Sequence, residues 1–108
     1  MTVAVARPVA AYLAAEAAKD ANTISRCFTE DGVVRDEGLA HRGRDAIRQW
    51  KAAADSKYKY VLVPLSVRAE GDKVTVRARL AGVFPGSPVE LDHIFTLSND
   101  EIASLEIR

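Results

Sequence analysis

The sequence has little of several residue types, and each shortage excludes a class of structure. Its 108 residues include a single cysteine, Cys27, so the chain cannot form an internal disulfide, which is typical of reducing compartments. No apolar run approaches the roughly 18 residues that a membrane-spanning helix needs. The amino-terminal segment lacks the basic start and unbroken apolar stretch of a secretory signal. We therefore expect a cytoplasmic protein that does not bind membranes.

An excess of one charge sign is also missing, because fifteen basic residues balance fifteen acidic ones. Without a net positive field, nothing favours binding to nucleic acid. The sequence has no Gly-rich phosphate loop, no nucleophile elbow, and no His or Cys spacing typical of a metal site. We expect no nucleic-acid partner, no metal and no cofactor.

The residues that are present indicate one globular domain over residues 1–108. The chain is 48% hydrophobic and 28% charged, and it is long enough to bury a core. An alanine-rich helix is predicted over residues 8–19, and a short second helix places Ile24, Cys27 and Phe28 toward the core. Residues 38–43 are predicted to form a loop, and residues 43–56 a third helix.

Beyond residue 56 the pattern changes to strands. Runs typical of strands cover residues 58–69, 73–84, 88–97 and 101–108, and the turns "EGD", "PGS" and "SND" separate them. Strands joined by short turns favour an antiparallel meander. Helices followed by a sheet predict an α+β fold in which the helices cover one sheet face.

Alternation within the strands predicts which side chains face inward. Asp36 shares a strand face with Val34, in a strand that begins at Val33, and a buried carboxylate is costly unless it is paired or neutralised. In the third long strand His93 shares a face with the apolar residues, whereas Asp92 lies on the other face. In the final strand the same rule predicts that Leu105 and its face are buried and that the alternate face, with Ile102, is exposed.

Three inward polar residues, Tyr12, Asp36 and His93, come from a helix, an early strand and a late strand. Their types suit proton transfer, with a carboxylate as the base and a phenol or imidazole as the donor to an oxygen. They are the candidate catalytic residues. The expected walls of a pocket for a small apolar molecule are Val34, Trp50, Leu80, Phe84 and Phe95, with His41 at its mouth.

Each candidate also has a structural interpretation. Asp36 could cap a turn or pair with Arg42 or His41 at the rim. His93 could be a satisfied core histidine, and Tyr12 could pack in the core with its hydroxyl bonded elsewhere.

The stretch "FTEDGVVRDEGLAHRGRDAIRQW", with "YLAAEAAKDANTISRC" before it, resembles the nuclear-transport-factor-2-like superfamily, and within it the SnoaL-like and ketosteroid-isomerase-like proteins. The resemblance implies a cone-shaped, curved antiparallel sheet wrapped around three N-terminal helices, a cystatin-like roll with an apolar pocket. Many members are homodimers, so the resemblance also implies a homodimer.

By this resemblance Asp36 falls where ketosteroid isomerases hold their general base, and Tyr12 where a first-helix tyrosine gives support. Asp92 can be aligned with the isomerases' oxyanion-binding aspartate only by a shift, and the alignment without a shift places His93 in the pocket. The expected function is acid–base chemistry of isomerase, cyclase or dehydratase type on an apolar carbonyl-containing ring or a polyketide-like substrate. The alternative is a non-catalytic ligand-binding or dimeric interaction module.

Overall fold

A computed structural model describes residues 5–108, and within them the chain forms three helices and six strands. In chain order these are α1 (Arg7–Ala17), α2 (Ala21–Arg26), β1 (Phe28–Asp36), β2 (Leu39–Arg42), α3 (Arg44–Tyr58), β3 (Val61–Glu70), β4 (Lys73–Ala81), β5 (Val89–Ser98) and β6 (Glu101–Ile107).

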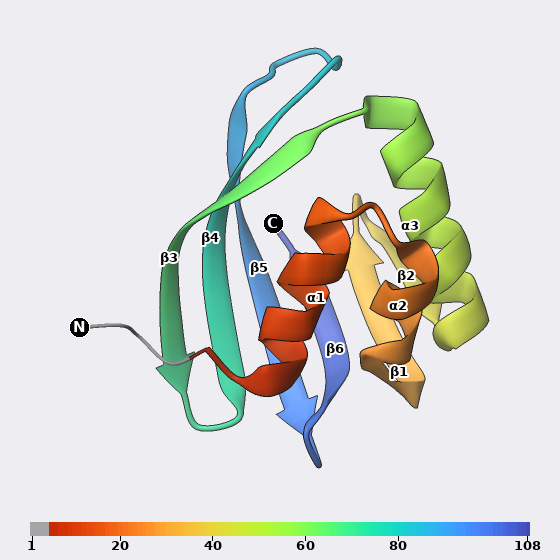
Figure 1. Cartoon of the computed structure of the whole chain (residues 1–108), viewed down its shortest axis with the longest axis vertical. Helices are drawn as coiled ribbons and strands as arrows, with labels where there is room; N and C mark the ends of the chain where they lie inside the picture. Colours follow the sequence, from red (N-terminus) through yellow and green to blue (C-terminus); the bar gives the residue numbers. More distant parts are fainter. Residues whose placement is uncertain (1–4) are drawn as a thin grey trace.

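The six strands form one curved sheet in the order β2-β1-β6-β5-β4-β3. The helices lie on one side of it, with α3 beside β1 and β2 (Figure 1). The predicted α+β fold and the meander from β3 to β6 are confirmed. The sheet is mixed because β1 pairs with β6 in parallel, which alternation within single strands does not predict.

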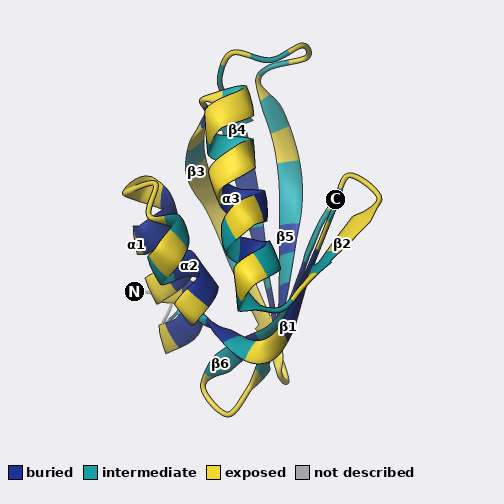
Figure 2. Cartoon of the chain, turned by 90° about the vertical axis from the view of Figure 1, so that its right-hand side faces the viewer, coloured by how far each residue is buried: buried dark blue, intermediate teal, exposed yellow. Residues whose placement is uncertain are grey.

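The core fills the space between the helices and the concave face of the sheet, where the buried residues lie (Figure 2). Tyr12 is at its centre, with its ring edge-on to Phe28 and Phe95 at centroid distances of 6.4 and 5.1 Å. These aromatic contacts connect α1 to β1 and β5. The other fully buried apolar residues of the core are Val9, Ile24, Val34, Ile47, Val76, Ile102 and Leu105.

Two predicted strand ends are wrong around the junction of α3 and β3. α3 continues to Tyr58, and Lys59 ends it in the left-handed conformation (φ 45°), so β3 begins at Val61 instead of residue 58. β4 ends at Ala81 instead of residue 84. The reason is a close approach, because the Val83 N–H donates to the Tyr58 carbonyl rather than to a strand partner (3.2 Å).

Three further predictions, which concern β2, β1 and β6, are wrong. Residues 38–43 are not a loop, since β2 forms a hairpin with β1 through a tight turn at Glu37 (φ 54°) and Gly38 (φ 78°). β1 begins at Phe28, which therefore belongs to the sheet and not to the second helix. Ile102 is fully buried although alternation placed it outside, because a register shift between β5 and β6 changes which residues face inward.

No helix within the described residues is both long enough and apolar enough to cross a bilayer.

Candidate functional site

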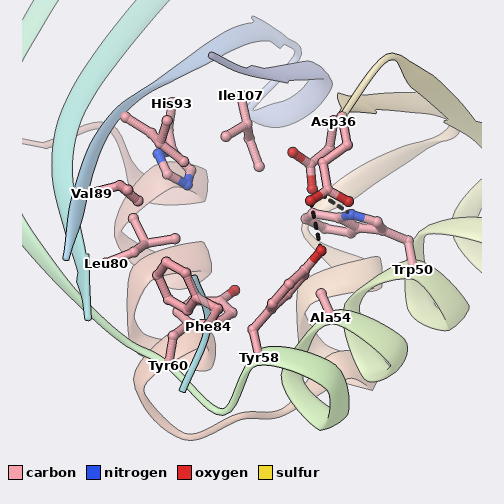
Figure 3. A pocket seen from close by; sticks show the side chains of 12 residues that line it. Asp36, Trp50, Ala54, Tyr58, Tyr60, Leu80, Phe84, Val89, His93 and Ile107 are labelled. Atoms are coloured by element: carbon pink, nitrogen blue, oxygen red, sulfur yellow. Dashed lines mark hydrogen bonds between the residues drawn. The ribbon is translucent and has the colours of Figure 1, made fainter. Parts of the chain in front are cut away.

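A cavity of about 140 Å³ opens between α3 and the concave face of the sheet (Figure 3). Side chains from α3, the turn after it and four strands meet around it. Most are apolar or aromatic, and the ionisable carboxyl and imidazole groups come from three residues. The lining residues are Asp36, Glu37, Trp50, Ala54, Tyr58, Tyr60, Leu80, Phe84, Val89, Leu91, His93 and Ile107.

Asp36 is the last residue of β1, where the strand delivers its carboxylate to the cavity beside α3. Its Oδ2 accepts a hydrogen bond from Nε1 of Trp50 at 3.1 Å. Burial raises the pKa of Asp36 above its ordinary value, and the Trp50 hydrogen bond opposes part of this rise. The arrangement holds a carboxylate that is more basic than an exposed one, which suits it to accept a proton.

His93 lies on β5, on a different side of the cavity from Asp36 (Figure 3). The residue is 3% exposed, and its Nδ1 is buried without a hydrogen-bond partner among the described residues. Burial lowers the pKa of His93 to about 4, so the ring is neutral near pH 7. A neutral imidazole has one donor and one acceptor nitrogen, so His93 can either donate a hydrogen bond to a ligand atom or accept one from it.

The structure brings five of the nine sequence-predicted residues together around the cavity and places four elsewhere. Those at the cavity are Asp36, His93, Trp50, Leu80 and Phe84. Val34, Phe95 and Tyr12 belong to the hydrophobic core, and His41 lies outside the lining with its ring 6.1 Å from that of Trp50.

The structure also decides two questions that the sequence left open, the facing of Asp92 and the partner of Asp36. Asp92 lies on the outer face of the sheet, where its Oδ1 is 3.2 Å from Nη1 of Arg77. Within the described chain Asp36 has no ion pair with Arg42, and its side-chain partner is Trp50.

Sequence reasoning missed two tyrosines at the carboxyl end of α3, its last residue Tyr58 and the nearby Tyr60. Tyr58 donates to Oε1 of Glu37 at 2.7 Å across the mouth of the cavity, and Tyr60 forms part of its wall. Both were assigned to a strand, which hid the helical spacing that places Ala54 and Tyr58 on the same side of α3. Three more lining residues, Val89, Leu91 and Ile107, lay on faces predicted to be inward.

Among residues 5–108, no three His, Cys, Asp or Glu side chains gather closely enough to hold a metal ion.

The profile of the SnoaL-like domain matches residues 9–105 of the chain. Because the match covers nearly the whole sequence, the chain belongs to the SnoaL-like family. No curated protein matches the sequence significantly.

Solved structures agree with this assignment. A proposed polyketide cyclase from Sinorhizobium meliloti is 42% identical, with a TM-score of 0.93 over 96% of this chain and 95% of that one. A protein of ketosteroid isomerase-like fold from Catenulispora acidiphila, in complex with trimethylamine, is 25% identical (TM-score 0.84; 97% and 86% covered). A cystatin-fold protein from Novosphingobium aromaticivorans, 19% identical, shares the fold (TM-score 0.82; 99% of both chains).

Proposed function

We propose that the protein is an acid–base enzyme in which Asp36 removes a proton from a carbon next to a carbonyl group. The observation that carries this proposal is the shared cavity of Asp36 and His93, which reach it from β1 and β5. A carboxylate of raised pKa and a neutral imidazole supply a base and a hydrogen-bond donor in one apolar site.

In the proposed reaction the Asp36 carboxylate takes the α-proton, and the electron pair of the broken C–H bond moves into an enolate. His93 donates a hydrogen bond to the enolate oxygen and so stabilises the charge that develops there. Return of the proton from Asp36 to another carbon gives isomerisation. Loss of a β-hydroxyl that takes this proton and leaves as water gives dehydration, and attack on a second carbonyl whose oxygen takes the proton gives ring closure. The same two residues support each outcome.

The proposed substrate is a small apolar molecule with a carbonyl group, of ring or polyketide-like type. The side chains of Leu80, Phe84, Val89 and Leu91 give the cavity an apolar lining that suits such a molecule. The Sinorhizobium meliloti relative, itself a proposed polyketide cyclase, supports this substrate class.

Deuterium exchange tests the proposal without knowledge of the natural substrate. In D₂O, the protein should accelerate loss of the C2 proton signal of 1-indanone in NMR spectra. Asp36→Asn should return the rate to that of buffer, whereas Glu70→Gln, at an exposed carboxylate outside the cavity lining, should exchange like the unmodified protein. Binding of ketones without any accelerated exchange would overturn the enzymatic proposal.

A non-catalytic binding module is the second candidate, and it has its own support. The Catenulispora acidiphila relative was solved with trimethylamine. The cavity of this chain combines the carboxylates of Asp36 and Glu37 with the rings of Trp50 and Tyr58, a combination that attracts ammonium groups. Tight binding of trimethylamine together with no exchange of any ketone would favour this candidate.

We also propose a second copy of the chain as the protein partner. β3 is an edge strand of the sheet, and its residues Val61, Val63 and Leu65 expose 48–64% of their surface to solvent. An apolar row on a sheet edge is a site where two chains associate.

A further inference from the structure

A group of charged side chains is buried behind the cavity, between α1 and α3. Lys51 has no exposed surface and Glu16 is 1% exposed. Nζ of Lys51 lies 2.5 Å from Oε2 of Glu16, donates to the hydroxyl of Tyr60 at 2.7 Å and also pairs with Asp55. The three donors of the ammonium group therefore have three partners.

Stability alone does not account for this arrangement. Burying an ion pair costs desolvation energy that the attraction between the charges roughly offsets, and well-packed apolar residues often serve as well. Apolar side chains could have joined α1 to α3 at this point. The network differs from a simple link because one of its members, Tyr60, also lines the cavity.

Tyr60 is held at both ends. Its backbone carbonyl accepts a hydrogen bond from Nζ of Lys19 at 2.5 Å, and its hydroxyl accepts one from Lys51. Gly82 encloses its backbone, since a Cβ on this glycine would lie 2.7 Å from the Tyr60 Cα. A phenol fixed in this way presents its hydroxyl with little loss of freedom when a ligand binds.

The Tyr60 hydroxyl keeps a proton that it can donate. Burial, and then the carboxylates of Glu16 and Asp55, raise the pKa of Tyr60 well above its ordinary value. Lys51 donates to the phenol oxygen, which leaves the O–H of the phenol to point elsewhere. A hydrogen bond to Glu16 adds to this rise, so a ligand oxygen would take the proton over from Glu16, whose charge Lys51 and Lys19 (3.2 Å) also compensate.

We propose that the Tyr60 hydroxyl donates a hydrogen bond to an oxygen of the bound ligand, and that buried Lys51 is the positioning residue that orients and polarises it. The lining contains two carboxylates and neither lysine nor arginine, which disfavours an anionic ligand, and a phenol donor suits a carbonyl or hydroxyl oxygen. This inference rests on the proposed function only in one respect, the choice of a carbonyl compound as the ligand.

A pair of probes that differ by one oxygen tests this contact. 1-Indanone carries a carbonyl group and indane does not, and NMR titration measures the affinity of each. Tyr60→Phe should weaken 1-indanone about tenfold, the upper range for one hydrogen bond, and leave indane unchanged. Tyr58→Phe is the matched control, since this neighbouring tyrosine also lines the cavity but donates to Glu37. Equal losses for both probes, or no loss, in Tyr60→Phe would overturn the proposal.

The role of Lys51 needs a measurement that would stay unchanged if Lys51 only stabilised the fold. With ¹³Cζ-labelled tyrosine, the Tyr60 signal should shift on adding 1-indanone and stay in place on adding indane. Lys51→Gln should reduce both this shift and the preference for 1-indanone. If Lys51→Gln does not fold, the Tyr60→Phe titration and the ¹³C shift still decide the ligand contact.

Failure of this inference is separable from failure of the proposed function. A preference for 1-indanone that depends on Tyr60, without any deuterium exchange, would overturn only the enzymatic proposal. Exchange that depends on Asp36, with a preference that Tyr60→Phe does not change, would overturn only the role of Tyr60.

Discussion

The indole Nε1 of Trp50 and the Oδ2 of Asp36 are 3.1 Å apart, and this hydrogen bond joins the middle of α3 to the end of β1. It fixes one oxygen of the carboxylate and leaves the other for a ligand. The same bond stabilises the charged form of Asp36 against the effect of burial. Trp50 therefore sets both the direction and the basicity of the proposed base.

Trp50→Phe should raise the pKa of Asp36 further, because the substitution removes the donor and keeps an aromatic side chain. A carboxyl NMR titration measures this shift. Asp20 in the same spectra is the internal control, since its carboxylate is bonded to Thr23 and does not line the cavity. An Asp36 pKa that falls in the variant would contradict the assigned role of the indole.

Asp36→Asn should reduce deuterium exchange of 1-indanone at least about 100-fold, the lower range for a general base. The amide keeps the size of the side chain and can still accept from Trp50, so folding should be unaffected. The pH profile offers a second measurement. Exchange in the unmodified protein should rise as pH increases through the raised pKa of Asp36, because only the carboxylate accepts a proton.

His93 should make the folded state less stable in acid. Its folded pKa of about 4 lies below the ordinary value of 6.5, so between these values the unfolded chain binds the proton more readily. The contribution is fully present above pH 6.5 and is lost as pH falls to 4, by about 3 kcal/mol. Urea unfolding between pH 4 and 7 measures it.

His93→Phe is the comparison that isolates the histidine, because other groups such as Asp36 titrate in the same range. The unfolding free energy of this variant should change less with pH than that of the unmodified protein. Parallel curves for the two proteins would mean that His93 does not titrate as described.

Gly82→Ala should destabilise the fold by about 1–3 kcal/mol, the usual cost of overpacking. The new Cβ would lie 2.8 Å from the Lys59 carbonyl oxygen and 2.7 Å from the Tyr60 Cα, and backbone atoms cannot move aside easily. Ala81→Ser at the exposed neighbour should change stability by less than about 0.5 kcal/mol. Urea midpoints for the two variants provide the test.

Val63→Lys should convert the proposed homodimer to a monomer, because it places a charge within the apolar row of β3. Analytical ultracentrifugation over a range of concentrations measures the masses. Glu70→Lys, an exposed change on the same strand, should leave the dimer intact. A monomer in the unmodified protein at every concentration would refute the proposed partner.

Alternation within strands was enough to predict much of this architecture. It placed His93 and the apolar residues on its face, such as Phe95, inside β5, because that strand is regular. It was wrong at Ile102, where a register shift between strands breaks the period. Such shifts depend on the partner strand, which a pattern read along one strand cannot include.

The candidate site was harder to predict because part of it lies on a helix end and a turn. Tyr58 and Tyr60 flank Lys59, whose left-handed conformation separates helix from strand, and an apolar sequence at that point is also typical of a strand. Lys51 is fully buried, whereas a lysine in a helix usually lies on its solvent side. Its partner Glu16 is 35 positions away along the sequence, so only the folded chain shows why the charge is tolerated.

The parallel pairing of β1 with β6 has a consequence for synthesis on the ribosome. β6 lies between β1 and β5, so the last of the six strands in chain order connects the hairpin of β1 and β2 to the other strands. Until residues 101–107 leave the exit tunnel, β1 lacks its inner neighbour and the cavity lacks Ile107. Folding that waits for such a distant pairing is slow, and the apolar strands made earlier stay exposed until β6 arrives.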